Sequence, residues 1–247
     1  MMNSLAIIGG TGLASLENLE IKRRQIVQTP YGEPSAPLSV GEIEGKEVLF
    51  LPRHGYGHTI PPHKINYRAN ISALKEAGVS HILAVAAVGS VNPELEATDI
   101  MVPDQIIDYT WSRINTFFEE GLSQVTHIDF TEPYCEDFRQ IILQSCDALD
   151  IPVKRTGTYA ATQGPRLETA AEIKRLGRDG CDIVGMTGMP EAALARELDL
   201  CYASIAVVAN KGAGLGNEEL TMDIIQHNLD SGLARVRSII ENIIPKI

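Results

Sequence analysis

The chain has 247 residues and a hydrophobic content of 44%, which is enough to bury one sizeable core. We expect a single domain over residues 1–247. The 32 acidic and 21 basic residues give a formal net charge of −11, and no Lys/Arg-rich run offsets it locally. We therefore expect no binding to nucleic acid or to an anionic membrane, and any small anion has to be held by a few donors within a pocket.

The cysteines and the N-terminus indicate a cytoplasmic protein. The N-terminal apolar stretch, Leu5–Ile8, is too short for a signal-peptide core or a membrane span. The four cysteines are widely spaced and form no CxxC pair, so we expect free thiols and neither a disulfide scaffold nor a zinc site. They are Cys135, Cys146, Cys181 and Cys201.

Short β-branched runs alternate with helical patterns along the chain, which predicts an α/β fold with a central sheet. The run HILAVAAVGS reads as a strand that is buried on both faces. Pro190 suits the first position of a helix, where proline loses no helical hydrogen bond. The strand-like segments are 5–10, 46–52, 81–90, 99–108, 155–162, 181–187 and 204–210. Helical patterns cover 66–78, 135–149, a segment from Thr169, 189–199 and 218–244.

Several of these strands end in glycine-rich or polar turns, where ligands gather in open α/β sheets. The turn Gly9–Gly12 exposes backbone N–H groups and the Thr11 hydroxyl to an anion, although a turn without a ligand has the same pattern. Arg53 and His54 follow the strand 46–52 and are suited to holding an oxyanion, although Arg-His pairs also occur on ordinary surfaces.

A metal site is the weaker interpretation of this region. His54, His58 and His63 have suggestive spacing, but no carboxylate or cysteine lies nearby in the sequence. A cationic arginine inside the cluster would oppose a divalent ion. We expect no metal.

Four further residues each have a structural and a functional interpretation. Thr187 precedes a helix, where its hydroxyl caps the helix or donates to an anion. Met186 fits a core or the floor of a sugar site. Glu168 suits the start of a helix as a favourable charge, and Asn210 suits a turn after its strand. None of these signals is specific alone.

Six motifs follow one another along nearly the whole chain. They are IIGGTGL, LPRHGYGHTIPPHKINYRANISALKEAG, AAVGSVNPE with DIMVPDQIID, THIDFTEPYC, GTYAATQGPRLET and MTGMPEAALARELDLCYASIA. With these motifs the chain resembles the trimeric purine-nucleoside phosphorylase family, and most closely its methylthioadenosine phosphorylase branch. The resemblance implies the nucleoside phosphorylase fold with a mixed sheet flanked by helices, a pentosyltransferase activity, a homotrimer and no cofactor, with inorganic phosphate as co-substrate.

The resemblance also implies a site and a mechanism. Phosphate attacks the anomeric carbon of an oxocarbenium-like sugar while the purine departs, and purine N7 takes a proton or a strong hydrogen bond. Met186 would lie against the ribose, and Asn210 and His54 would be the catalytic residues. The implied phosphate site consists of Thr11, Arg53, His54, the backbone at Ala87 and Thr187.

The purine pocket departs from the methylthioadenosine branch, which carries aspartates after the SIA strand and a serine after GPRF. This chain has Asn210 and Glu168 at those places, with Leu167 beside the latter, and so resembles enzymes acting on inosine and guanosine. Asn210 can donate to O6 and accept from protonated N7, and Glu168 can accept from N1–H. Adenine has no N1–H, so it would leave the carboxylate unpaired.

At the other end of the substrate, the resemblance indicates an apolar pocket. His127 matches a position that reaches the 5′ pocket of a neighbouring subunit, and Met222 with Ile225 would add apolar surface there. A 6-oxopurine site joined to an apolar 5′ pocket predicts 5′-methylthioinosine as the nucleoside. The alternatives are an inosine/guanosine phosphorylase or a methylthioadenosine phosphorylase. A nucleosidase that uses water would not need the anion-binding residues, and a purine-binding protein without activity would be expected to lose part of the site.

Overall fold

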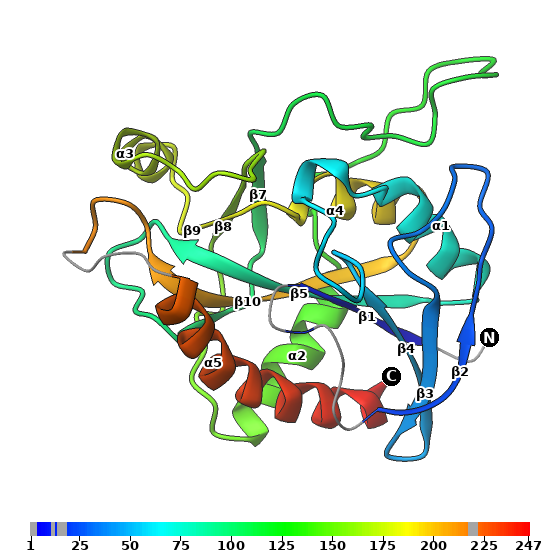
Figure 1. Cartoon of the computed structure of the whole chain (residues 1–247), viewed down its shortest axis with the longest axis horizontal. Coiled ribbons are helices and arrows are strands. Elements are labelled where there is room, and N and C mark those ends of the chain that lie inside the picture. The colour runs from blue at the N-terminus through cyan, green and yellow to red at the C-terminus, as the bar shows by residue number, and fades with distance from the viewer. Residues whose placement is uncertain (1–3, 11–12, 14–18, 217–221) are drawn as a thin grey trace.

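The structure is a computed structural model that describes residues 4–10, 13, 19–216 and 222–247. In this part of the chain, ten strands form one mixed sheet (Figure 1). The strand order is β2-β3-β4-β1-β5-β9-β8-β7, and β10 pairs with β5 and β6. The strands are β1 (Leu5–Gly9), β2 (Glu20–Gln25), β3 (Leu38–Ile43), β4 (Lys46–Pro52), β5 (His81–Ser90), β6 (Ile100–Met101), β7 (Gln105–Asp108), β8 (Thr158–Ala161), β9 (Ile183–Gly185) and β10 (Cys201–Lys211).

Helices cover both faces of this sheet (Figure 1). On one face α1 (Tyr67–Glu76) packs against α4 (Gly188–Glu197), and on the other α2 (Glu136–Ala148) packs against α5 (Met222–Ile243). Each pair closes its own large apolar cluster over the sheet. The remaining helical elements are α3 (Ala170–Arg178), which lies at the end of the sheet near β8 and β9, and two short 3₁₀ turns, η1 (Pro62–Lys64) and η2 (Ile244–Lys246).

Most of the elements form where the sequence patterns indicate them. β5, the run HILAVAAVGS, is the centre of the sheet, pairing in parallel with β1 and β10 and antiparallel with β9. The helix expected from Thr169 begins with a capping box between Thr169 and Glu172. In α4, Met189 is extended and precedes a cis peptide bond, so helical geometry begins at Pro190. The predicted α/β fold with a mixed sheet is confirmed.

The sequence patterns missed one part of the sheet. β2 and β3 form an antiparallel extension with β4, and most residues of β2 are exposed. The charged run EIKRRQ carries no hydrophobic alternation that would indicate a strand. The expected strand 99–108 divides into β6 and β7 around Pro103, which cannot donate to a sheet ladder.

The expectation of four free thiols was wrong for two of them. Cys135 and Cys201 form a disulfide with a Cα–Cα distance of 5.2 Å, whereas Cys146 and Cys181 are free and buried. The first residue precedes α2 and the second begins β10, and the Cys135 N–H donates to the carbonyl of Tyr202 at 2.8 Å. The fold thus joins two cysteines that lie 66 positions apart, which spacing in the sequence does not reveal. No helix in the described ranges is long and apolar enough to span a bilayer.

Candidate active site

A cavity of about 540 Å³ opens where β1, β4, β5 and β10 end. Nine of the predicted site residues line it, although they come from segments far apart in the sequence. The loop between β4 and η1 and the segments around Glu168 and Met186 complete its walls. The nine residues are Arg53, His54, Ala87, Leu167, Glu168, Met186, Thr187, Asn210 and Ile225.

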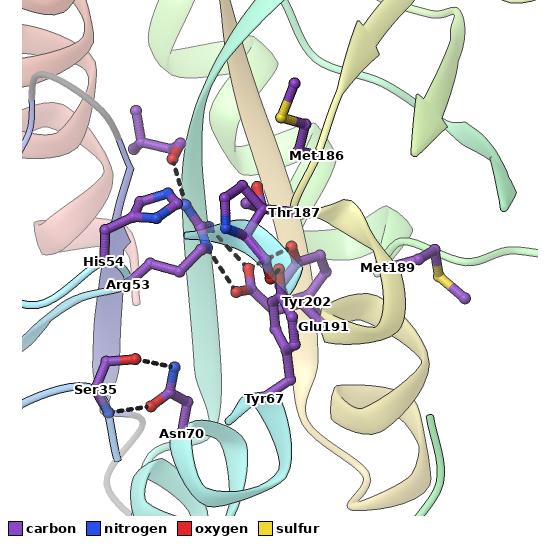
Figure 2. A network of polar contacts seen from close by, with 12 residues as sticks. Ser35, Arg53, His54, Tyr67, Asn70, Met186, Thr187, Met189, Glu191 and Tyr202 are labelled. Carbon is purple, nitrogen blue, oxygen red and sulfur yellow. Dashed lines mark hydrogen bonds and ion pairs between the residues drawn. The ribbon is translucent and has the colours of Figure 1, made fainter. Parts of the chain in front are cut away.

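Arg53 is held almost completely by other groups of the protein (Figure 2). Its side chain is 1% exposed, and Nε and Nη2 donate to the two carboxylate oxygens of Glu191 at 2.7 and 2.8 Å. Nη1 donates to the carbonyl of Val85 at 3.2 Å, and Tyr202 donates its hydroxyl to Glu191 at 2.9 Å. Burial opposes the positive charge, but Glu191 outweighs this effect and raises the pKa of Arg53 above its ordinary value. The guanidinium is therefore charged, fixed in place and paired with a carboxylate.

His54 lies beside this pair with one ring nitrogen already engaged. Its Nδ1 is 2.8 Å from the carbonyl oxygen of Ile60, which can only accept, so Nδ1 carries a hydrogen. Burial lowers the pKa of His54 to about 4; the Ile60 hydrogen bond opposes this shift, and the electrostatic interactions with Arg53 and His58 add to it. The neutral ring consequently carries a lone pair on Nε2. We expected His54 to donate a hydrogen bond to an anion. Because its Nδ1 hydrogen is used by Ile60, its remaining ring nitrogen accepts a hydrogen bond instead.

Thr187 and Met186 lie together on the segment between β9 and the helical part of α4 (Figure 2). Thr187 occupies the position before α4, yet its side chain makes no capping hydrogen bond. The capping interpretation is therefore wrong, and the residue lines the cavity. Met186 packs against Gly164, where a Cβ would lie 2.4 Å from the methionine sulfur and where φ is +60°. A larger residue at Gly164 would have to displace the Met186 side chain and keep a left-handed backbone conformation that glycine favours.

Glu168 and Asn210 each have a partner that fixes their direction. Thr162 donates its hydroxyl to Oε1 of Glu168 at 2.7 Å. Asn210 donates one amide hydrogen to the carbonyl of Lys211 at 2.8 Å, and the register between β10 and β5 shifts between Val208 and Asn210. Such a bulge re-aims the side chains that follow it. One Glu168 oxygen, one amide hydrogen and the amide oxygen of Asn210 have no hydrogen bond in the described residues.

Three predicted residues are not placed in the cavity. Thr11 lies outside the described residues, and so does the side chain of Met222, the first residue of α5. His127 is exposed on the long loop between β7 and α2, which projects from the body in Figure 1. Its predicted role involves a neighbouring subunit. Within the described ranges, no three His, Cys, Asp or Glu side chains are grouped as a metal site requires.

Comparison with known proteins assigns the family. A model described as the phosphorylase superfamily matches residues 4–245. The chain belongs to the phosphorylase superfamily. A probable S-methyl-5′-thioinosine phosphorylase of Pseudomonas syringae pv. tomato is 51% identical, with 98% of this chain and 99% of the relative covered. A 6-oxopurine nucleoside phosphorylase of Pyrococcus furiosus is 50% identical, with 89% and 84% covered.

The fold is also that of a solved member of this family. The methylthioadenosine phosphorylase of Schistosoma mansoni, determined in complex with adenine, superimposes with a TM-score of 0.94 at 35% identity, covering 98% of this chain and 91% of that one. Together these matches confirm the predicted class, a nucleoside phosphorylase of the pentosyltransferase type.

The residues whose hydrogen bonds orient the site residues were not identified from the sequence. Glu191 fixes Arg53, Tyr202 fixes Glu191, and Thr162 fixes Glu168. Glu191 stands in the motif MTGMPE, but Arg53 is 138 positions away and nothing in the sequence connects them. The burial of Glu191, which requires a partner for its carboxylate, is visible only in the structure.

Proposed function

We propose that the protein cleaves S-methyl-5′-thioinosine with inorganic phosphate, giving hypoxanthine and S-methyl-5-thioribose 1-phosphate. The supporting observation is that a single cavity contains both an anion-binding group and a group suited to a 6-oxopurine. Arg53, His54 and Thr187 form the first, and Glu168 with Asn210 forms the second. In this proposal residues 1–247 form one domain, and no metal or cofactor takes part.

The phosphate end is proposed to bind hydrogen phosphate in one orientation. Arg53 has N–H groups beyond those used on Glu191 and Val85, and these can donate to the ionised oxygens. His54 can accept the remaining P–OH hydrogen at Nε2, because its Nδ1 hydrogen is used by Ile60. The backbone at Ala87, the hydroxyl of Thr187 and, from the sequence, Thr11 would complete the phosphate site.

The purine end is proposed to recognise a 6-oxopurine through two residues. Asn210 has one amide hydrogen for O6 and its oxygen for protonated N7, because the other hydrogen is donated to Lys211. Glu168 has a free oxygen for N1–H, because Thr162 occupies the other. Asn210 thereby stabilises the departing base at N7, while Leu167 and Met186 contact the base and the ribose. An adenine would present a lone pair to Glu168, which is unfavourable.

The 5′ end is proposed to be apolar and shared between subunits. Ile225 lines the cavity from the start of α5, and Met222 lies one turn before it. We infer that the enzyme is a homotrimer in which His127 of a neighbouring subunit closes this pocket. The long exposed loop that carries His127 also exposes Trp111, Ile114 and Val125, as a segment that packs on another subunit would. A cytoplasmic location remains our prediction.

A screen with purified protein tests this proposal. Methylthioinosine, methylthioadenosine, inosine and adenosine are each incubated with and without phosphate, and base release is measured. We expect phosphate-dependent release that is fastest, by kcat/KM, with methylthioinosine. Equal rates without phosphate would contradict the phosphorylase, and equal turnover of methylthioadenosine would contradict the 6-oxopurine preference.

An inosine/guanosine phosphorylase is the second candidate. The relative from Pyrococcus furiosus carries the broader name 6-oxopurine nucleoside phosphorylase at nearly the same identity as the methylthioinosine relative. Burial of a methylthio group on apolar side chains is worth about 1–3 kcal/mol, so methylthioinosine should be favoured over inosine by about 5- to 150-fold. A preference for inosine would select the second candidate.

A further inference from the structure

Arg113 lies outside the cavity but contacts several of its walls. It belongs to the loop between β7 and α2, is half-buried, and donates from all three nitrogens of its guanidinium. Nε donates to the side-chain oxygen of Gln163 at 3.1 Å, and Nη2 donates to the carbonyl oxygens of Thr162 at 3.1 Å and Gln163 at 2.8 Å. The two hydrogens of Nη1 are shared among three acceptors, which are the carbonyl oxygens of Met186 at 2.8 Å and Met189 at 2.6 Å and the hydroxyl of Tyr67 at 3.2 Å.

These acceptors belong to segments that form different walls of the cavity. Thr162 fixes Glu168 through its hydroxyl and accepts from Arg113 through its carbonyl. Met186 lines the cavity directly, and Met189 lies two residues before Glu191, the partner of Arg53 (Figure 2). We call the wall that carries Glu168 the purine wall and the wall that carries Arg53 the phosphate wall. Both walls are thus hydrogen-bonded, through Thr162 and Met189, to the guanidinium of Arg113.

The wall of the cavity that contains Pro62 is connected to Arg113 through Tyr67. Its hydroxyl accepts from Arg113 and donates to the carbonyl of Pro62 at 3.0 Å, and Pro62 lines the cavity. Burial raises the pKa of Tyr67, so the hydroxyl keeps the hydrogen that this second bond requires. The Arg113 guanidinium also lies 5.5 Å from the centre of the Tyr67 ring, within the range of a cation–π contact.

The acceptors of Arg113 are neutral. No carboxylate in the described part of the chain forms an ion pair with it. A guanidinium has five N–H donors in a rigid plane, whereas a lysine has three on one atom and cannot reach acceptors on several segments in the same way. The arrangement is therefore specific to arginine.

We propose that Arg113 is a positioning residue that holds the purine wall and the phosphate wall at the separation that the reaction requires. This inference rests on the proposed function, because it requires that phosphate and a purine nucleoside react at a defined separation in the cavity. Attack by phosphate in line with the departing purine depends on the relative placement of both ligands, whereas the binding of either alone depends only on its own wall. Arg113 touches neither ligand.

The proposal predicts a split between turnover and binding in Arg113→Met. A misplacement of about 1 Å between reacting groups costs about 100-fold in rate, so kcat should fall by about that factor. The dissociation constants of hypoxanthine alone and of inorganic phosphate alone should each change by less than about threefold, because each wall remains intact. A general loss of structure would instead weaken the binding of both hypoxanthine and phosphate and also lower kcat.

Arg68→Met is the matched control. Arg68 also ties this loop to α1, since it donates to Glu119 at 2.6 Å and to the carbonyl of Thr116 and lies 5.0 Å from the centre of the Tyr31 ring. Neither Arg68 nor any of these partners lines the cavity. Its loss should leave kcat within about twofold of wild type, because within the described ranges the Arg68 side chain is hydrogen-bonded to no residue that lines the cavity.

The single tryptophan of the chain gives a second readout. Trp111 lies two residues before Arg113, and its backbone N–H donates to the same Gln163 oxygen at 3.2 Å. Its fluorescence anisotropy should fall in Arg113→Met, because this part of the loop loses the attachment that Arg113 provides. Arg113→Lys keeps the positive charge but has fewer N–H donors. Its anisotropy and kcat should therefore lie between those of wild type and Arg113→Met.

The outcomes separate this inference from the proposed function. Wild type is assayed first, and phosphate-independent cleavage there would contradict the proposed function alone. If wild type requires phosphate, an unchanged kcat in Arg113→Met overturns the inference, and so does a loss carried entirely by one of the two dissociation constants. Should Arg113→Met not fold, Arg113→Lys decides by the same criteria.

Discussion

The buried pair between Arg53 and Glu191 makes the replacement Glu191→Gln a severe test of the site. Both side chains are at most 1% exposed, and the carboxylate accepts two hydrogen bonds from Arg53 and one from Tyr202. Glutamine has one acceptor oxygen and no charge, so the arginine would remain buried without its counter-ion. Breaking a buried pair in this way costs about 3–5 kcal/mol. For a chain of this size the melting temperature should fall by about 10 °C.

Two further variants separate the charge from the hydrogen bonds and from phosphate binding. Tyr202→Phe removes one bond to the same carboxylate but leaves the ion pair, and should cost only about 1 kcal/mol. Replacing Arg53 and Glu191 together by methionine removes both charges and should recover most of the stability. That double variant should nevertheless gain no stability from phosphate, whereas a ligand at 100 times its Kd stabilises the wild type by about 2.7 kcal/mol.

The assay is thermal and urea unfolding of the four proteins, with and without phosphate. A melting temperature of Glu191→Gln within about 2 °C of wild type would refute the reasoning, because the expected loss is at least about 3 kcal/mol. Equal stabilisation of wild type and the double methionine variant by phosphate would refute the placement of Arg53 in the phosphate site.

Three other predictions follow from the cavity. The pKa of His54 is about 4 in the folded protein against an ordinary 6.5, so its contribution to stability is present above pH 6.5 and is lost as the pH falls towards 4. Unfolding measured as a function of pH should show that His54→Asn removes up to about 3 kcal/mol of this dependence. Ile225→Asn should reduce the preference for methylthioinosine over inosine by about tenfold in kcat/KM. Asn210→Asp alone should lose 6-oxopurine activity and gain little on methylthioadenosine, whereas Asn210→Asp with Glu168→Ser should reverse the preference non-additively.

Several of the cavity residues were predictable because they lie at the ends of recognisable strands. Arg53 and His54 directly follow β4, and Asn210 lies near the end of β10. The apolar runs of those strands identify them in the sequence, and the carboxyl ends of parallel strands meet at one edge of the sheet. A polar residue that follows such a run is therefore a candidate site residue on the strength of the sequence alone.

The residues that support the cavity were not predictable for a physical reason. The acceptors of Arg113 are mainly backbone carbonyls, which every residue possesses, so no pattern of side chains marks the contact. The disulfide and the Arg53–Glu191 pair join positions that are close only in the folded chain. The strand β2 is mostly exposed and charged, so periodicity carries no signal there.

The balance of charge at the phosphate end bears on how the proposed reaction is accelerated. Glu191 offsets the charge of Arg53, and His54 is neutral at pH 7, so these three residues together carry no net charge. Hydrogen phosphate would be oriented by N–H donors and by the lone pair of His54, but its own negative charge would remain largely uncompensated by this group. That charge then lies next to the anomeric carbon, where positive charge develops as the purine departs. Stabilisation that appears only in the transition state raises kcat, whereas an unpaired arginine would mainly tighten the binding of free phosphate.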